Sequence, residues 1–426
     1  MSVRDTEPTL RAATKVWWRI GILSFGGPAA QIALMHREIV ESRKWLTEKQ
    51  FLNALSFCML LPGPEAMQLA TYAGWRLHGV LGGLIAGFLF VLPGAVVIMA
   101  LAAIYSVFGN VPLVAALFFG IKAAVLVVVV EALLRVAKKA LAARHQWIIA
   151  IAAFVSIFFL SLPYPLIVLA AAAIGYVSSF SKPTEQASVA ENISTGQTLQ
   201  TILLWLGIWL LPVLALSMFS APQILTDIGL FFSTLAVVTF GGAYAVLAYM
   251  AQDAVLQFGW LTAGEMIDAL GLAETTPGPL ILVTQFVGFL AGFKEGDIWL
   301  GISAAMIALW VTFAPCFLWI FAGAPYIEWM SNQPRLKGAL DAITAAVVGV
   351  ILNLSIWFSL HVLFSTVVKS EIGILTIWRP EISSIQWMAV ILFFVSAYLV
   401  FRRHWNILWV LFFAAVSGAS LKLAFG

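Results

Sequence analysis

The chain has 426 residues, of which 62% are hydrophobic and only 10% are charged, and its formal net charge is +3. A soluble fold of this length cannot bury so much apolar surface, so these values exclude a soluble globular protein. Continuously apolar runs of about 20 residues, the length that crosses a bilayer core, also argue against the alternating strands of a β-barrel. The composition therefore predicts an all-α polytopic membrane protein.

Thirteen apolar segments follow one another along the chain. They are expected near 12–35, 51–75, 79–105, 112–134, 146–160, 164–180, 200–220, 228–250, 266–293, 299–325, 340–367, 386–401 and 405–424. The long polar stretch 181–200 lacks aromatic residues and is rich in Ser, Thr, Gln and Glu, which predicts a flexible linker. Polar residues 1–11 without a small-residue cleavage site predict that no signal peptide is removed.

The second half of the chain repeats the first. Phe25-Gly26-Gly27 recurs as Phe240-Gly241-Gly242, and Pro62-Gly63-Pro64 recurs as Pro277-Gly278-Pro279, so both motifs return at the same offset. Six apolar segments are thus used twice, with one additional segment between the copies. We expect an N-terminal repeat over 1–180, a cytoplasmic linker plus a connecting transmembrane helix over 181–226, and a C-terminal repeat over 227–426.

The additional segment predicts that the two copies lie in opposite orientations. Equivalent points of the copies are separated by seven segments, and an odd number of crossings reverses direction. The loop 36–50 contains four Lys and Arg residues, whereas its counterpart 251–265 contains none. Positively charged loops face the cytoplasm, which favours the inverted repeats of secondary transporters. Basic residues on both sides of the FGG and PGP segments leave open whether these segments cross the membrane or re-enter.

Glycine and proline interrupt both motif-bearing segments, and we expect broken helices there. A break within hydrocarbon survives only where it is buried in protein or lines a wet cavity. It exposes a helix N-terminus, whose free N–H groups and partial positive charge suit an anion. Pro28 and Pro64 fit the first turn of the helix that follows each break. Four such helix starts, two per copy, predict a site for a tetrahedral oxyanion; the alternative is kinks that only allow close packing.

Three ionisable residues are candidates for transport chemistry. Lys122 lies about ten residues into an apolar segment, where a charge is costly, so it either binds an anionic substrate or forms a structural ion pair. Glu65 follows the first PGP and either carries a proton or caps the new helix. Glu274, which precedes the second PGP, is the other proton-coupling candidate. No nucleotide-binding loop, HExxH, CxxC or nucleophile elbow occurs, which predicts a secondary transporter rather than an enzyme, without cofactor, metal site or nucleic-acid partner.

The stretch from Ser24 to Gly94, which carries FGGP and PGPE at this spacing, resembles the signature region of the chromate ion transporter family in its long, two-domain form. The second half resembles it again through "TFGGAYAVL" and "AETTPGPLILV". The resemblance implies proton-motive-force-driven export of chromate across the bacterial inner membrane, which confers chromate resistance. It also implies a relation to sulfate, which has the same shape and charge. Copy two departs from the pattern, since Ala243 replaces the FGGP proline and Leu280 replaces Glu65.

The motifs and the resemblance together give the predicted site. The substrate-binding candidates are Ser24, Phe25, Gly26, Gly27, Pro28, Pro62, Gly63, Pro64, Gln68, Lys122, Thr239, Gly241, Gly242, Thr276 and Gly278. Two alternatives to chromate export remain: transport of sulfate or another oxyanion, and a membrane assembly protein without flux. The small-residue face Gly79–Gly87 fits either a homodimer interface or an internal contact.

Overall fold

The computed structural model describes residues 8–109, 111–179, 195–240, 243–331 and 333–425. The chain forms two compact units, each assembled from three stretches of sequence. The first unit comprises Met1–Ala100, Ser178–Ala243 and Thr276–Lys337, and the second comprises Leu101–Val177, Tyr244–Thr275 and Gly338–Gly426. Each unit therefore contains segments from both sequence repeats.

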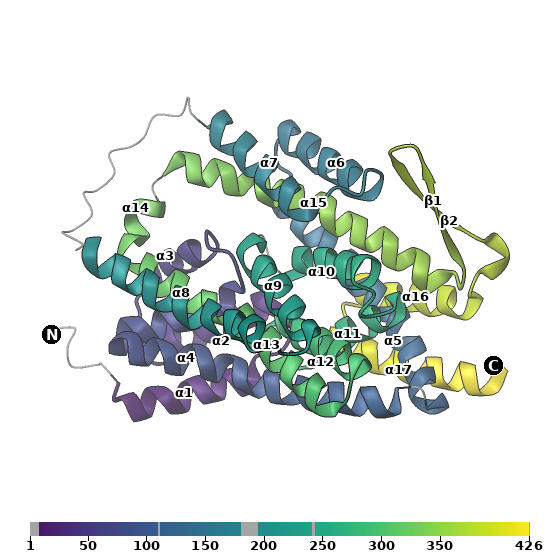
Figure 1. The fold of residues 1–426 in the computed structure, drawn as a ribbon, viewed down its shortest axis with the longest axis horizontal. Coiled ribbons are helices and arrows are strands. Elements are labelled where there is room, and N and C mark those ends of the chain that lie inside the picture. Colours follow the sequence, from purple (N-terminus) through teal and green to yellow (C-terminus); the bar gives the residue numbers. More distant parts are fainter. Residues whose placement is uncertain (1–7, 110, 180–194, 241–242, 332, 426) are drawn as a thin grey trace. The chain divides into compact units, whose positions relative to one another are not determined.

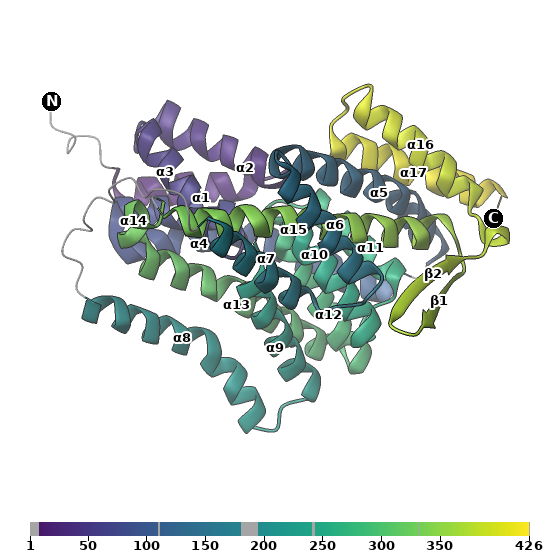
Figure 2. The same ribbon diagram turned by 90° about the horizontal axis from the view of Figure 1, so that it is seen from above.

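Helices make up nearly all of both units (Figures 1 and 2). The first unit contains α1 (Leu10–Leu23), α2 (Gly27–Met35), α3 (Glu48–Cys58), most of α4 (Glu65–Phe108), α8 (Thr195–Met218), α9 (Gln223–Val238), α12 (Val283–Glu295), α13 (Ile298–Gly323) and α14 (Ile327–Ser331). The second unit contains the end of α4, then α5 (Pro112–Ala140), α6 (Arg144–Phe158), α7 (Tyr164–Ser178), α10 (Ala243–Gln252), α11 (Ala263–Thr275), α15 (Pro334–Leu363), α16 (Trp387–Phe401) and α17 (Ile407–Phe425).

Within the described ranges, six helices are long and apolar enough to cross a membrane. They cover Glu65–Phe108, Pro112–Ala140, Gly196–Met218, Ile298–Tyr326, Pro334–Leu363 and Ile407–Ala424. Four further apolar helices, α6, α7, α9 and α16, are shorter. The predicted all-α polytopic membrane protein is confirmed.

α4 is a helical hairpin rather than one continuous rod. Its 44 residues would extend about 66 Å at 1.5 Å per residue, roughly twice a bilayer core. The backbone leaves the helical region at His78 and Gly79, where the sequence predicted a turn. A Cβ atom on Gly74 would lie 2.3 Å from the carbonyl oxygen of Gly82, so the two arms pack directly on each other. The glycine-rich face Gly79–Gly87 thus makes contacts within the chain. It does not support the predicted homodimer, which stays a prediction.

A β-hairpin follows α15 where the sequence predicted only a loop. Strand β1 (Val367–Ile372) pairs antiparallel with β2 (Leu375–Pro380), and Ile372 lies opposite Leu375. β-Branched residues favour the strands, and Gly373 has the positive φ that a tight two-residue hairpin turn needs at its first central position. The charged residues Lys369, Glu371 and Arg379 interrupt the apolar pattern of both strands, so the strands were not predicted from the sequence.

The structure repeats the same local elements in the two halves of the chain. π-Helices, which are rare, occur at His36–Ser42 and at Asp253–Gln257. Each is followed by a helix whose first turn is capped reciprocally, by Thr47 with Gln50 in α3 and by Thr262 with Glu265 in α11. These positions share the offset that relates the FGG and PGP motifs, so the sequence repeat is also a repeat of backbone conformation.

Small residues allow the helices of the second unit to approach closely. α16 and α17 lie beside α5 in both views (Figures 1 and 2). A Cβ atom on Gly120 of α5 would lie 1.8 Å from the carbonyl oxygen of Ala414 in α17. On Gly175 of α7 it would lie 2.2 Å from the carbonyl oxygen of Gly338 in α15. Close backbone approach through glycine is the main packing mode between membrane helices.

Gly120→Ala should therefore destabilise the protein by about 1–3 kcal/mol, because the added methyl group must push α5 and α17 apart. The matched control is Gly207→Ala in α8, where the nearest atom to an added Cβ is Leu211 Cδ1 at 3.6 Å. The control should be neutral or slightly stabilising, because alanine favours helix. Thermal unfolding in detergent measures both variants, and equal unfolding temperatures would contradict the close packing.

Candidate functional site

The helices break at the FGG and PGP motifs, as the sequence predicted. α1 ends at Leu23 and α2 begins at Gly27, with Pro28 in its first turn; Gly26 and Gly27 both have positive φ. α3 ends at Cys58 and α4 begins at Glu65, with φ of +111° at Gly63 between them. In copy two, α9 ends at Val238, and α11 ends at Thr275 before Gly278, whose φ is +90°. The predicted site residues Gly241 and Gly242 lie outside the described residues.

Two equivalent backbone hydrogen bonds join these breaks within the first unit. The N–H of Gly63 donates to the carbonyl of Thr239 at 2.9 Å, and the N–H of Gly278 donates to the carbonyl of Ser24 at 2.7 Å. Gly63 and Gly278 are equivalent in the two copies, and so are Ser24 and Thr239. The PGP break of each copy is thus bonded to the FGG segment of the other, in an exchange that a two-fold relation produces. We call this arrangement the crossing.

Side chains complete the hydrogen bonding of the crossing. Ser24 and Thr239 are buried, and their hydroxyls donate to the carbonyls one helical turn earlier, at Ile20 and Leu235. Nε2 of Gln31 donates to the carbonyl of Gly278 at 2.6 Å and to that of Ser24 at 3.3 Å. Backbone groups released by the broken helices are therefore paired inside the protein, as an apolar environment demands.

Two buried amides leave an acceptor unpaired. Nε2 of Gln68 donates to the carbonyl of Pro62 at 2.7 Å, which holds the PGP break against the first turn of α4. Oε1 of Gln31 and Oε1 of Gln68 have no hydrogen-bond partner among the residues that the structure describes. A buried unpaired acceptor costs about 1–3 kcal/mol, so these amides suit a site that admits water or a polar ligand.

A small cavity lies at the crossing. It measures about 20 Å³, and three helix starts line it: Pro28 of α2, Glu65 and Ala66 of α4, and Leu280 and Ile281 of the 3₁₀ turn (Leu280–Leu282) that leads into α12. Gln31, Gly63 and Thr239 also line it. This volume holds about one water molecule. A tetrahedral oxyanion is larger than this volume, so it fits only in a wider form of the cavity.

Other predicted residues lie around the crossing with different exposure. Thr276 is buried beside the second PGP, and Phe25 is exposed at the first break. Glu65 is the first residue of α4, in the position that the capping interpretation requires, and it also lines the cavity. The fourth predicted helix start, that of α10, adjoins the residues that are not described.

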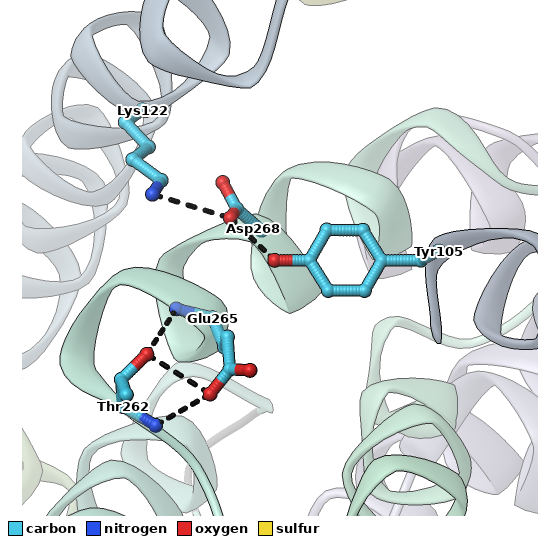
Figure 3. A network of polar contacts seen from close by, with 5 residues as sticks. All are labelled: Tyr105, Lys122, Thr262, Glu265 and Asp268. Atoms are coloured by element: carbon cyan, nitrogen blue, oxygen red, sulfur yellow. Dashed lines mark hydrogen bonds and ion pairs between the residues drawn. The ribbon is translucent and has the colours of Figure 1, made fainter. Parts of the chain in front are cut away.

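Lys122 and Glu274 lie in the second unit and so form no part of the crossing as described. Figure 3 shows Lys122 of α5 pointing toward Asp268 of α11, with Nζ 3.2 Å from Oδ2. The hydroxyl of Tyr105, near the end of α4, donates to the same oxygen at 2.8 Å. The structural ion pair foreseen as one alternative for Lys122 is formed in this structure, and substrate binding at Lys122 stays a prediction.

Glu274 has a separate set of partners. The hydroxyl of Tyr244 donates to its Oε1 at 2.6 Å, and the carboxylate is buried. On the neighbouring helix α5, Arg135 and Glu131 form an i,i+4 ion pair at 2.5 Å. A buried carboxylate beside a tyrosine hydroxyl fits a proton carrier and a purely structural hydrogen bond equally, so the proton-coupling assignment stays a prediction.

The sequence analysis missed Gln31, Tyr105 and Asp268. Asp268 gave a weaker signal than Lys122, because it is only the third residue of the apolar segment 266–293, whereas Lys122 was selected by its depth in its segment. Gln31 is a single polar residue in the apolar run "PAAQIAL", which gives a weaker signal. Nothing in the sequence indicated that Tyr105 reaches Asp268.

A polar pocket of about 330 Å³ occupies another part of the second unit. Its lining includes Ser161, Asp253, Gln257, Lys369 and Trp378. These residues come from the connection between α6 and α7, from the π-helix Asp253–Gln257 and from the two strands of the β-hairpin. Lys369 also lies 2.8 Å from the carboxylate of Glu371, and this ammonium group lowers the pKa of Glu371.

The fold and the crossing define a polytopic α-helical membrane protein with duplicated broken helices. The family model described as "Chromate transporter" matches residues 12–176 and 226–419, and the chain belongs to this family. A "Chromate transport protein" of Pseudomonas aeruginosa is 31% identical over 78% of this chain and 77% of its own. One from Cupriavidus metallidurans is 28% identical over 80% and 81%, and a "Probable chromate transport protein" of Synechococcus elongatus is 29% identical over 80% and 83%. No solved structure matches the chain significantly.

Gln31→Leu tests the contribution of the amide at the crossing. The variant keeps the side-chain size but leaves the carbonyl of Gly278 with one donor fewer, so we expect a loss of about 1–3 kcal/mol in unfolding free energy. Thermal unfolding in detergent measures the loss. Gln257→Leu, at an exposed position in the second unit, is the control and should change stability by less than about 0.5 kcal/mol. An equally small effect of Gln31→Leu would show that the amide does not hold the crossing.

Proposed function

We propose that this protein is a secondary transporter that exports chromate from the cytoplasm across the inner membrane of a bacterium, driven by the proton-motive force, and so confers chromate resistance. The names of its relatives support the substrate. The reciprocal hydrogen bonds of the crossing are the observation that carries the mechanism. They place the helix starts of both copies around one cavity, where N–H groups and helix dipoles favour a small anion.

In the proposed mechanism, transport proceeds by opening one reciprocal bond at a time. Release of the Gly63–Thr239 bond separates the first PGP break from the second FGG segment. Release of the Gly278–Ser24 bond separates the second PGP break from the first FGG segment. Because the two bonds are equivalent in the repeats, each opening admits the substrate from a different side if the repeats are inverted. The predicted residues Gly63 and Gly278 would then meet the oxyanion through the N–H groups freed by these openings, whereas Ser24 and Thr239 free only carbonyl oxygens, which accept hydrogen bonds.

Three features support the inverted arrangement. The exchanged contacts of the crossing are those of a two-fold relation, and an odd number of predicted segments between equivalent points favours an axis in the membrane plane. The segments near 161–165, 251–265 and 368–385, each of which has fewer Lys and Arg residues than its counterpart in the other copy, all contribute to one pocket. The repeats proposed for 1–180 and 227–426, with 181–226 between them, follow from the same offsets; most of the linker lies outside the described residues.

Export is the direction that the membrane potential favours. A potential is worth about 2.3 kcal/mol per charge per 100 mV, so a dianion leaving a negative interior gains about twice that amount. Uptake against the same potential would need additional coupling ions. Sulfate has the same geometry and charge as chromate, and nothing in the lining of the crossing distinguishes the two.

Proteoliposomes loaded with labelled chromate test the transport function. We expect efflux that accelerates several-fold when an interior-negative potential is imposed, with protein-free liposomes as the control. Efflux at the rate of protein-free liposomes would contradict transport and favour the assembly protein. Equal efflux of chromate and sulfate in matched liposomes would show that the substrate is tetrahedral oxyanions in general and not chromate in particular.

A reversible cross-link tests whether the first PGP break must move against α13 during transport. A Cβ atom on Gly63 would lie 3.1 Å from Sγ of Cys316. This is close to the distance between the Cβ atom of one cysteine and the sulfur of the other in a disulfide. Gly63→Cys in a Cys58→Ala background should therefore form a disulfide with Cys316 on oxidation, lose more than about 90% of its chromate flux, and regain it on reduction.

Gly63→Ser is the matched control, because it places a side chain of similar size at the same positive φ without a thiol. Its flux should not respond to oxidant. If the oxidised Gly63→Cys protein transports as fast as the reduced one, the first PGP break does not move away from Cys316 of α13 during transport.

A further inference from the structure

We infer that Asp268 is an internal competitor for the transported oxyanion: the anion binds at Lys122 in place of the Asp268 carboxylate, and Asp268 takes up a proton when it does so. The inference rests on the proposed function and deepens it, because it assigns the proton linkage to a residue outside the FGG and PGP motifs. It also allows Lys122 to bind the anionic substrate, as predicted, although Lys122 forms an ion pair with Asp268 when no anion is bound.

The geometry makes the exchange possible. The side chain of Lys122 is 28% exposed, whereas that of Asp268 is only 4% exposed, so an anion can reach the ammonium group more easily than the carboxylate. Oδ2 of Asp268 holds both Lys122 and Tyr105. Oδ1 is buried and has no hydrogen-bond partner in the described part of the chain. One oxygen is thus fully used, and the other is able to accept a proton without breaking a contact.

The start of α11 provides room for the ammonium group of Lys122 and a helix dipole that favours an anion beside it. A Cβ atom on Gly264 would lie 3.0 Å from Nζ of Lys122, so the missing side chain leaves room for the ammonium group against the first turn of α11. Gly271 packs on Ile121 in the same way and holds α11 close to α5. An anion at Lys122 would lie near the N-terminus of a 13-residue helix, whose dipole favours negative charge.

The remaining charged groups around Asp268 have other partners. Glu265, one turn earlier on α11, accepts from the N–H of Thr262 at 2.7 Å and from its hydroxyl at 2.9 Å (Figure 3). Lys422 of α17, which also packs on α11, lies over the ring of Phe119. On α5, Glu131 and Arg135 pair with each other more than two turns from Lys122. Lys122 is therefore the cation that neutralises Asp268 in this structure.

Charge balance links the proton to the anion. The pair of Lys122 and ionised Asp268 has no net charge. Binding a dianion to Lys122 leaves a net charge of minus two if Asp268 stays ionised and minus one if it takes a proton from solution. A buried carboxylate without its cation is strongly disfavoured, so the protonated form prevails. Anion binding should then take up one proton. The affinity for the anion should fall up to tenfold per pH unit above the midpoint, which is the pH at which half of Asp268 is ionised in the anion-free protein.

Calorimetric titration with chromate, repeated in buffers of different ionisation enthalpy, counts the protons taken up. Wild type should take up close to one proton above the midpoint. Asp268→Asn, which mimics the protonated acid in shape, should bind with no uptake and, at high pH, at least about tenfold more tightly than wild type. Glu131→Gln is the matched control, since it removes another carboxylate paired with a cation on α5, and it should retain the wild-type uptake. Chromate's own protonation affects all three proteins alike.

The outcomes separate the inference from the function on which it rests. If wild type does not bind chromate, the proposed function fails. If wild type binds chromate without proton uptake, or if Asp268→Asn takes up protons as wild type does, the inference is overturned and the function stands.

Tyr105→Phe keeps the test decisive if Asp268→Asn does not fold. It removes a donor to the ionised carboxylate only, so proton uptake should persist with its midpoint moved to higher pH. An unchanged midpoint in Tyr105→Phe would overturn the assignment as well.

Discussion

Inside a bilayer every backbone N–H and C=O must find a partner within the protein, and this requirement shapes the first unit. Four breaks in two pairs of helices would release many polar groups if each copy stood alone. The reciprocal bonds from Gly63 to Thr239 and from Gly278 to Ser24 show how the duplication resolves this. Each copy supplies what the other lacks, so neither set of broken helices is expected to be stable without its partner.

The same exchange recurs with charges in the second unit. Lys122 belongs to copy one and Asp268 to copy two, and each neutralises the other where an isolated charge would be costly. Glycine packing follows the same scheme, because α5 pairs with α17 and α7 pairs with α15 across the repeats. The duplicated chain is thus interleaved rather than divided into two consecutive domains, which is why each compact unit contains parts of both copies.

Much of this architecture was predictable from the sequence, for identifiable reasons. Apolar length gave the helices, and glycine and proline gave the breaks, because these residues act through local backbone geometry. The turn within α4 followed from the basic residues and glycine near Arg76–His78. Contacts between distant segments were not predictable in the same way. The ion pair of Lys122 with Asp268 and the hydrogen bond from the side-chain amide of Gln31 to Gly278 depend on how helices far apart in sequence pack. No local sequence pattern encodes such contacts. The β-hairpin was missed because a short strand pair has little hydrophobic signal in a chain dominated by helices.

The symmetry of the crossing is broken by its buried amides. Gln31 reinforces the bond between Gly278 and Ser24 by donating to both carbonyls, whereas the equivalent position in copy two is Val246, which has no polar side chain. Gln68 holds the first PGP break through the carbonyl of Pro62, and its equivalent in copy two is Val283, so different side chains support the two halves of the crossing. In the proposed mechanism, two halves that are held by different side chains open at different cost, so the resting protein favours one side. A duplicated protein of this kind can thus acquire a preferred resting state from a few side chains, while the membrane potential still sets the direction of transport.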